Sequence, residues 1–555
     1  KQITIEAIFG IYDLLGGSYA AVVTESEPYV AAAGIEIRRA KCISIVPLFQ
    51  SNSLSQSRKQ DEEAYLDLLR TTLLEHKFFY SSTFEITHTQ QRISKFRQDQ
   101  LLEPMWMRAE PAFFWNRELV YELINKRADD WIVPFMSGHI EYEPQCRADD
   151  ESFDLLFISR RSKFRQGCRF TKRGVDENGH VANFVETEQI LIMRDRITSY
   201  VQIRGSMPLL WSSPVHMKYA PEVQISPNTA KSVECCERHV KDVVDLYSDE
   251  AAKLDIIFIN LVDNKKEQGR LGAAFKEVVD VVREKSRVPM KYVWFDFHAE
   301  CKKKGKWANL SKLVKQVDEA FMAQGFFSKT TTGSVTYQKG IIRTNCMDNL
   351  DRTNVVQSLF ARRSLLMQLN KASLLKSEDV LNTPFKKFET VYKRAWINNA
   401  DSMSLMYAGT GALKVDFTKT GKRTVAGMFN DGVNSCMRYY LNNFTDGRKQ
   451  DGIDLMLGRY KAYLQNSSPF DPVVGQENIE SHALRGFILL VSIFSVFVFL
   501  SPSMNFVDKL STYFLLSLLM AVIVCGYILY VIVRKGSKLG ESLVGRPRLC
   551  PETPY

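Results

Sequence analysis

The sequence predicts an α/β catalytic domain that is tethered to a membrane by a two-helix hairpin. Between residues 150 and 465, strand-like apolar runs alternate with amphipathic helical runs, a pattern typical of α/β folds. Further along, two uncharged stretches, 487–507 and 513–533, are each long enough to cross the hydrocarbon core of a bilayer. These two observations set the expected architecture.

The composition agrees with a folded chain of two or three domains. Of its 555 residues, 45% are hydrophobic and 25% charged, and 73 basic against 63 acidic side chains give a net charge of +10. These proportions exclude a mostly disordered chain and a many-span transporter. The modest positive charge suits anionic substrates or an anionic membrane surface, and we expect no nucleic-acid partner. The ten scattered cysteines form no CxxC pair, which predicts reduced thiols and no metal site.

Residues 1–145 are predicted to form a mixed α+β subdomain. Strand-like alternation occupies 3–17 and 20–25, and 61–75 has a helical pattern. The polar run 141–152 interrupts this pattern and marks the predicted boundary. Because the sequence opens on Lys1 rather than Met, we expect the start of this subdomain to be truncated.

Residues 146–464 are predicted to form the catalytic domain. Strands are expected within 153–161, 254–263 and 291–299, and helices at 273–285 and 310–324. On a strand, Asp296 and His298 would point the same way, either as an acid or orienting pair at the site or as a satisfied polar pair at a strand end.

The carboxyl end is predicted to hold the membrane hairpin. A polar linker, 465–486, precedes the two stretches, and a tail, 534–555, follows them. The short connection 508–512 predicts an antiparallel pair. Basic side chains flank the pair on both outer sides, so positive-inside logic places both termini in the cytosol. These flanking side chains are Arg485, Arg534, Lys535 and Lys538.

One short segment has the residues needed for hydrolysis of a phosphate monoester. Cys346 and Arg352 stand five residues apart, between an apolar strand-like run and an amphipathic helical pattern. A loop over a helix N-terminus directs backbone N–H groups inward and forms a phosphate nest. The helix end and Arg352 favour a Cys346 thiolate, which attacks phosphorus while Arg352 holds the phosphate oxygens. Thr353 is placed to hydrogen-bond the sulfur, and the chemistry needs no metal or cofactor.

The other residues of this segment have predicted roles as well. The leaving alkoxide needs a proton from a carboxylic acid, and the segment offers Asp348 and Asp351, between which the residues themselves do not decide. Met347, Asn349 and Leu350 complete the loop and are expected to bind the phosphate.

The segment 343–358 resembles the signature of the Sac-domain phosphoinositide phosphatases, usually RxNCxDCLDRTN. The resemblance implies an N-terminal Sac half packed on a Cys-x5-Arg phosphatase domain. It also implies hydrolysis of phosphatidylinositol 4-phosphate, and of the 3-phosphate, to phosphatidylinositol through a cysteinyl-phosphate intermediate. With the hairpin, it implies a multi-pass protein of the endoplasmic reticulum and Golgi membranes. Further blocks that resemble the family in order are 159–190, 203–211, 295–301 and 407–424.

The resemblance assigns roles residue by residue. Cys346 would be the nucleophile and Arg352 the phosphate clamp. The related myotubularin loop has an Asp just before its Arg, which favours Asp351 as the general acid. Asn349 stands where the family usually has a second Cys, so a loop disulfide with Cys346 is excluded.

Other hypotheses remain beside this one. The same loop could serve a protein tyrosine phosphatase, although such loops usually carry glycines that 346–352 lacks, or an inactive membrane-contact protein. Two basic runs, 160–173 and 414–423, are expected to form solvated faces or to meet anionic lipid headgroups. Gly526, Tyr527 and Tyr530 suit a helix–helix face, so membrane-protein partners of the hairpin are a further prediction.

Overall fold

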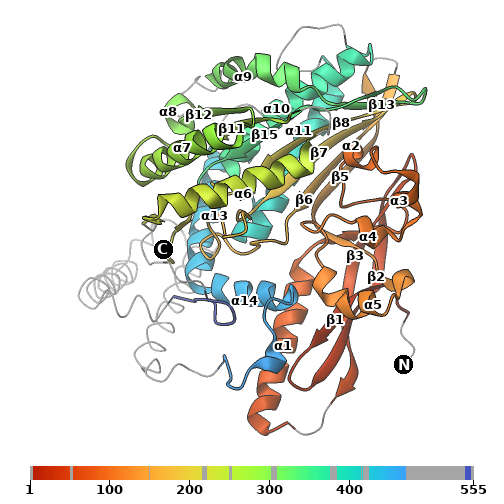
Figure 1. Ribbon diagram of the computed structural model, residues 1–555, viewed down its shortest axis with the longest axis vertical. Helices are drawn as coiled ribbons and strands as arrows, with labels where there is room; N and C mark the ends of the chain where they lie inside the picture. Colours follow the sequence, from red (N-terminus) through yellow and green to blue (C-terminus); the bar gives the residue numbers. More distant parts are fainter. Residues whose placement is uncertain are drawn as a thin grey trace, which may run out of the picture.

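A single large mixed sheet organises the protein (Figure 1). It has thirteen strands, eleven of them in the order β1-β2-β3-β4-β5-β6-β7-β8-β15-β11-β12. The structure is a computed structural model that describes residues 4–50, 54–148, 151–215, 222–248, 253–301, 309–375, 384–413, 415–416, 424–470 and 544–551.

The amino-terminal part of the sheet is antiparallel from β1 to β8. Neighbouring strands pair in chain order, and several bulges shift the register, as between Glu143 and Cys146. Bulges bend and twist a strand locally. The strands are β1 (Ala7–Asp13), β2 (Gly17–Ala32), β3 (Ile35–Gln50), β4 (Phe78–Tyr80), β5 (Phe135–Ala148), β6 (Glu151–Arg161), β7 (Val185–Ile192) and β8 (Arg196–Arg204).

The path from β8 through β15 and β11 to β12 is parallel and positions the site, while β13 pairs antiparallel with β8 and with β14. β15 pairs in parallel with both β8 and β11, and β11 pairs in parallel with β12. Strands buried on both faces are apolar runs, as in the sequence DIIFIN of β11. The remaining strands of this sheet are β11 (Asp255–Asn260), β12 (Met290–Trp294), β13 (Phe327–Thr330), β14 (Val335–Thr336) and β15 (Gly340–Asn345). β9 (Trp211–Ser212) and β10 (Gln224–Ile225) form a separate two-stranded antiparallel sheet.

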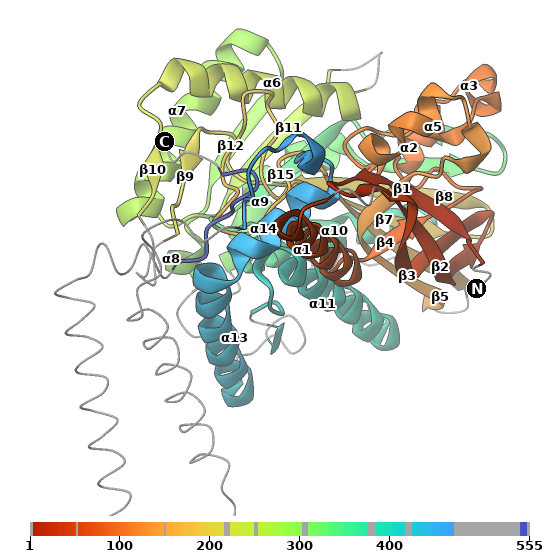
Figure 2. The ribbon, with the colours of Figure 1, turned by 90° about the horizontal axis from the view of Figure 1, so that it is seen from below.

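Long helices cover both faces of the parallel part (Figure 2). α6 and α7 pack on one face, and α9, α10 and α11 pack on the other, each through its apolar side. Burial of these apolar faces is the main stabilising term of the domain. The helices are α6 (Thr229–Tyr247), α7 (Lys266–Ser286), α9 (Leu310–Gln324), α10 (Asp351–Lys371) and α11 (Lys386–Ala408).

A third core joins the two ends of the chain. α1 (Gln56–Glu75) packs against β1, β2 and α14 (Asp446–Met456), and Leu549 lies in the same cluster. α13 (Val425–Phe444) leads into α14. The short helices are α2 (Gln90–Ile93), α3 (Gln98–Leu102), α4 (Met105–Arg108), α5 (Tyr121–Asn125) and α8 (Phe297–Cys301), with 3-10 turns at Arg117–Val120, Asp129–Trp131 and Ala462–Leu464.

The predicted α/β class is confirmed, while the predicted membrane hairpin lies outside the described residues. No helix among the described residues is long and apolar enough to cross a bilayer. The predicted spans 487–507 and 513–533 lie outside those residues, as do most of the linker 465–486 and of the tail 534–555. The boundary at 145 falls inside β5, in a continuous sheet, and the division into domains stays a prediction.

Two local predictions are wrong. The stretch 291–299 is not all strand: β12 ends at Trp294 and α8 begins at Phe297, because Asp296 Oδ1 accepts the N–H of Ala299 at 2.9 Å and starts a helical turn. The basic run 160–173 is not a solvated face. Most of its cationic side chains are buried, namely Arg160, Arg161, Lys163, Lys172 and Arg173.

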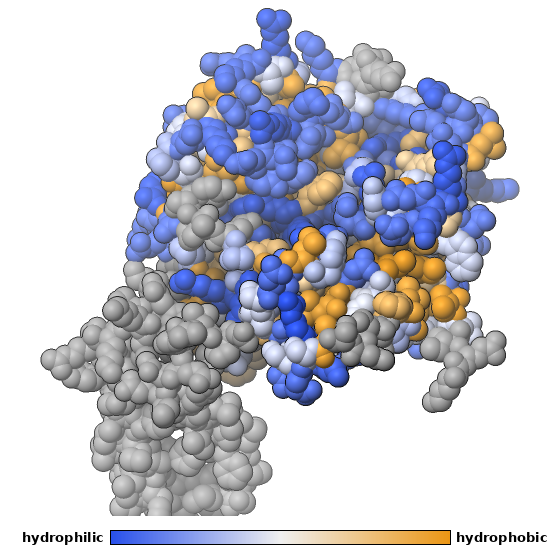
Figure 3. Space-filling view, turned by 60° about the horizontal axis from the view of Figure 1, so that its bottom comes forward, coloured by the Kyte–Doolittle hydropathy of each residue, from blue (hydrophilic) through white to orange (hydrophobic). Residues whose placement is uncertain are grey.

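One of these buried cations, Arg160, has carboxylate partners on the neighbouring strand, whereas the guanidinium nitrogens of Arg161 have no hydrogen-bond partner among the described residues. Arg160 is fully buried and donates to Glu186 at 2.7 Å and to Glu188 at 2.8 Å, both on β7. Outside such clusters, hydrophilic side chains cover most of the face shown in Figure 3, with apolar groups in separate patches between them.

Candidate active site

The loop from Cys346 to Leu350, here called the Cys346 loop, follows the central parallel strand. β15 ends at Asn345 and α10 begins at Asp351. Ligands of open α/β sheets bind outside the carboxyl ends of the strands, where this loop lies. The predicted order of strand, loop and helix N-terminus is therefore confirmed.

Asn349 shapes the loop. Its φ of 53° lies in the left-handed region, which Asn adopts more readily than most side chains. Its Oδ1 accepts the backbone N–H of Cys346 at 3.3 Å, so the side chain also closes the loop onto its first residue. Cys346 is only 2% exposed in this arrangement. The departure from the usual family signature at 349 thus has a conformational reason.

Asp348 is fixed by two arginines. Its carboxylate oxygens accept from Arg169 and Arg173, each at 2.7 Å, and Arg173 also donates to the carbonyl of Met347 at 2.8 Å. Burial opposes ionisation of Asp348, but the two guanidinium groups outweigh burial and hold the pKa of this carboxyl well below its usual range. A carboxyl with so low a pKa is a poor proton donor, so Asp351 is left as the candidate for that role.

Asp351 is the first residue of α10 and faces α13. Its carboxylate accepts the N–H of Leu413 at 2.7 Å and a guanidinium N–H of Arg438 at 3.2 Å. Arg438 is itself buried and also bonded to Thr410, Ser404 and Gly411. The carboxylate of Asp351 therefore links the helix behind the Cys346 loop to α13.

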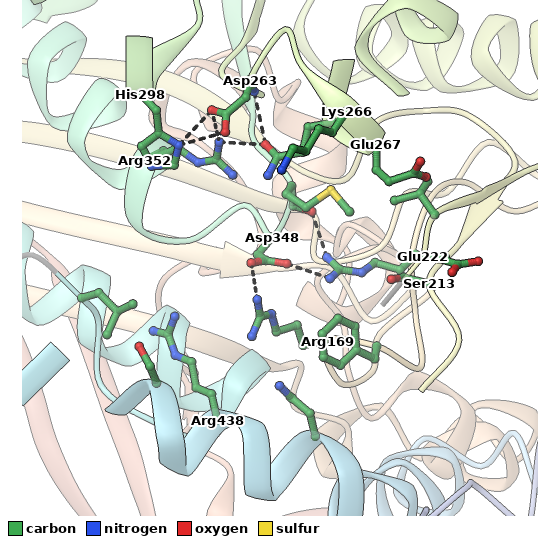
Figure 4. A pocket seen from close by; sticks show the side chains of 18 of the residues that line it. Arg169, Ser213, Glu222, Asp263, Lys266, Glu267, His298, Asp348, Arg352 and Arg438 are labelled. Carbon is green, nitrogen blue, oxygen red and sulfur yellow. Dashed lines mark hydrogen bonds and ion pairs between the residues drawn. The ribbon is translucent and has the colours of Figure 1, made fainter. Parts of the chain in front are cut away.

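Arg352 points to the loop after β11. One guanidinium nitrogen donates to the carbonyl of Leu261 and to Gln268 Oε1, both at 3.1 Å, and lies 3.4 Å from Asp263 Oδ1. Asp263 in turn lies 2.9 Å from Nδ1 of His298 (Figure 4). The predicted phosphate clamp is thus held by acceptors that a phosphate would have to replace.

The remaining predicted residues lie at different depths. Thr353 is fully buried, and its hydroxyl has no hydrogen-bond partner among the described residues, so its hydrogen bond to the sulfur stays a prediction. Met347 borders the cavity, whereas Leu350 packs on Tyr407 and Ala408. Side chains 349 and 350 therefore lie beneath the loop, and only their backbone groups are suited to bind phosphate.

A cavity of about 740 Å³ opens beside the loop. Figure 4 shows the labelled side chains around it, with Asp348 and Arg169 on one side, Asp263, His298 and Arg352 on another, and Arg438 coming from α13. Cys346 itself lies below the lining. The lining cations are Arg169, Arg173, Lys265, Lys266, Arg352 and Arg438.

Arg204 places a second positive charge near the sulfur. It ends β8, directly opposite Thr344 on β15, and is 1% exposed. Its three guanidinium nitrogens have no hydrogen-bond partner within the described ranges. Burial lowers the pKa of Arg204 to about 10, and the Cys346 side chain acts in the opposite direction. Arg204 is therefore a buried guanidinium that interacts with the Cys346 side chain.

Sequence reasoning missed several of these side chains. Arg204 lies in the family block 203–211, but nothing in that block indicates chemistry. Arg169 and Arg173 belong to the basic run for which the sequence predicts a surface position. No motif in the sequence marks Asp263 or Arg438 as a site residue, because their role depends on contacts between distant segments. Within the described ranges, no three or more His, Cys, Asp or Glu side chains come together as possible metal ligands, and the metal-free mechanism stays a prediction.

Comparison with known proteins finds related sequences. Residues 6–302 match the family described as SacI homology domain. Phosphatidylinositol-3-phosphatase SAC1-A of Danio rerio is 38% identical over 460 residues, 82% of this chain and 76% of the relative. Phosphatidylinositol-3-phosphatase SAC1 of Drosophila melanogaster is 38% identical over 82% of this chain and 74% of its own. Phosphoinositide phosphatase SAC8 of Arabidopsis thaliana is 31% identical over 99% of this chain and 89% of its own.

Proposed function

Since the chain belongs to the SacI homology domain family and is a phosphoinositide phosphatase, we propose that it hydrolyses phosphatidylinositol 4-phosphate, and the 3-phosphate, through a thiolate on Cys346. One observation carries this proposal. Cys346 lies between the central parallel strand and the N-terminus of α10, with Arg352 in the first turn of that helix. This is the arrangement that a phosphate nest with a thiolate nucleophile requires.

The chemistry proceeds in two steps. The thiolate of Cys346 attacks phosphorus, the bond to the inositol oxygen breaks, and Asp351 gives that oxygen its proton. Water then attacks the cysteinyl phosphate and gives its proton to Asp351, which releases inorganic phosphate and restores the thiolate. Arg352 and the backbone N–H groups at the start of α10 stabilise the phosphoryl oxygens in both steps.

Three rearrangements precede the first step. Asp351 takes up a proton and leaves Leu413 and Arg438 for the inositol oxygen. Arg352 exchanges its acceptors around Asp263 for the phosphate oxygens, and Asn349 releases the N–H of Cys346 so that the buried sulfur meets the cavity. Arg173 and Asp348 keep the middle of the loop in place meanwhile. The phosphate oxygens of the substrate contact Arg352 only after this rearrangement, so substrate binding itself stabilises the rearranged state.

The proposal places the enzyme in the membranes of the endoplasmic reticulum and Golgi, with both termini in the cytosol. Its support is the family resemblance and the two uncharged stretches 487–507 and 513–533 with their flanking basic residues. A phosphoinositide in a bilayer is the substrate, and anionic headgroups beside it are further partners.

Phosphate release by the full chain in detergent tests the proposal. We expect release from phosphatidylinositol 4-phosphate and 3-phosphate, and little from a phosphotyrosyl peptide. Cys346→Ser should abolish release, whereas Cys42→Ser, at an exposed thiol on β3, should not change it. Full activity of Cys346→Ser, or preference for the peptide, would contradict the proposal.

A further inference from the structure

α13 carries an apolar stripe that nothing among the described residues covers. Phe429 is 70% exposed and Val425 80%. The apolar positions recur every three or four residues, so they share one side of the helix. The stripe consists of Val425, Met428, Phe429, Val433, Met437 and Tyr440.

The stripe carries no charge. Asp431 and Arg438 are the only charged residues of α13, and Arg438 is buried against the helices behind the stripe. Figure 2 shows α13 projecting from the body of the protein beside α11. A convex, uncharged helix side of this kind fits a flat apolar partner better than a groove-binding peptide.

A different side of the same helix borders the active-site cavity. Ser435, Arg438, Tyr439, Asn442 and Asn443 line that cavity, and Arg438 reaches the carboxylate of Asp351 on α10. Whatever the stripe binds therefore lies next to the opening through which a phosphorylated headgroup reaches the Cys346 loop.

The path of the chain brings a bilayer to this side. The described chain stops at Phe470 and resumes at Val544, and these two points are close, since Arg548 donates to the carbonyl of Phe470 at 3.3 Å. Gly545 donates to the carbonyl of Asn443, in the last turn of α13, at 2.8 Å. Both ends of the segment with the two uncharged stretches thus attach beside the carboxyl end of α13.

Chain length limits how far that bilayer can be. Residues 534–543 connect the second uncharged stretch to Val544, and ten residues span at most about 35 Å. α13, with 20 residues, is about 30 Å long. A bilayer that holds this stretch is therefore within reach of the stripe.

We propose that α13 is an interfacial helix, whose apolar stripe lies in the surface of the phospholipid bilayer that contains the substrate and sets the cavity against the headgroups. This proposal rests on the proposed function, because it takes the substrate to be a lipid in that bilayer. The helix needs no additional partner protein for this contact.

The test uses the full chain reconstituted in phosphatidylcholine vesicles that contain phosphatidylinositol 4-phosphate. Phe429→Asp should lower phosphate release from the vesicles on the order of tenfold, since it removes one buried aromatic side chain from the docked state. It should leave unchanged the hydrolysis of a water-soluble, short-chain phosphatidylinositol 4-phosphate. Phe429→Leu should retain activity on both substrates.

The matched control places the same charge on another exposed apolar side chain. Leu102, at the end of α3, is 81% exposed, and Leu102→Asp should leave both activities unchanged. Equal activity of Phe429→Asp and wild type on vesicles, or an equal loss on both substrates, would overturn the proposal. So would a concentration-dependent dimer that Phe429→Asp abolishes, because the stripe would then bind a second copy. Failure of the proposed function is distinct, since the wild type would then hydrolyse neither substrate.

Discussion

The charged side chains on the two sides of the Cys346 loop, Asp348 and Arg352, differ in how closely their partners bind them. On one side, Asp348 receives two guanidinium N–H groups at 2.7 Å, and one of these arginines also fixes the carbonyl of Met347. On the other side, Arg352 shares a single nitrogen among Leu261, Gln268 and Asp263 at 3.1–3.4 Å. The contacts of Asp348 with Arg169 and Arg173 suit a permanent structural cluster. The longer contacts of Arg352 suit replacement by the oxygens of a phosphate.

From this difference we expect the charge of Asp348 to contribute to the stability of the fold and the charge of Arg352 to contribute to catalysis. Asp348 is a half-buried carboxylate between two arginines, and removing its charge leaves their guanidinium groups uncompensated. A guanidinium that faces one carboxylate and two neutral oxygens loses little when an anion replaces them. Substitutions on the two sides should therefore affect different measurements.

The largest effect is expected on the exchangeable side. Arg352→Met removes the positive charge that stabilises the phosphoryl oxygens, and it should lower kcat for phosphatidylinositol 4-phosphate about a thousandfold, or about 4 kcal/mol. The thermal unfolding midpoint of the full chain in detergent should hardly move. If Arg352→Met lost much stability but kept its turnover, Arg352 would be a structural residue and this prediction would be contradicted.

The next effect is expected on the fixed side. Asp348→Asn leaves Arg169 and Arg173 without their carboxylate and should destabilise the fold by about 3 kcal/mol. Thermal unfolding of the full chain measures this change. Asp67→Asn is the matched control, because its partner Arg448 is solvent-exposed and such a pair contributes at most about 1 kcal/mol. Equal midpoints for the two variants would show that the fixed side is not a stabilising cluster.

The same cluster predicts a pH dependence of stability. The pKa of Asp348 is held below its value of about 3.9 in an unfolded chain, so its contribution is fully present above about pH 4 and is lost as the pH falls further, towards the folded pKa. The difference in unfolding midpoint between wild type and Asp348→Asn should be constant near neutral pH and shrink below about pH 4. A difference that grows on acidification would have the wrong sign.

The smallest effect is expected at Asp263. Asp263→Asn removes the carboxylate that competes with phosphate for Arg352. It should lower KM about threefold, or about 0.6 kcal/mol, and should leave kcat unchanged within about twofold. Steady-state kinetics on the short-chain substrate measures both constants. Asp318→Asn, which faces Arg363 on the outside of α10, should change neither. If kcat of Asp263→Asn fell tenfold, Asp263 would take part in the chemistry.

Local patterns in the sequence predicted the frame of the site. The strands β6 and β11 and the helices α7 and α9 fall where apolar periodicity placed them, and the Cys346 loop joins a strand to a helix as its flanking residues indicated. These features depend on neighbours along the chain, which a sequence displays directly.

Contacts between distant segments could not be predicted in this way. Arg160 looked like a surface residue because its carboxylate partners lie on the next strand, and the clamp on Asp348 joins residues about 180 positions apart. The alternation around Asp296 and His298 imitates a strand, and only the capping bond of Asp296 shows a helical start. Tertiary pairing decided the first two cases, and a local capping bond decided the third.

The central claim is that the sulfur of Cys346 carries the phosphoryl group during turnover. Rapid quenching of the full chain in neutral denaturant, after mixing with phosphatidylinositol 4-phosphate labelled in its 4-phosphate, measures this most directly. The account predicts transient label on the peptide that contains Cys346, and none in Cys346→Ser. Label on another residue, or turnover with no labelled protein at any time point, would contradict it.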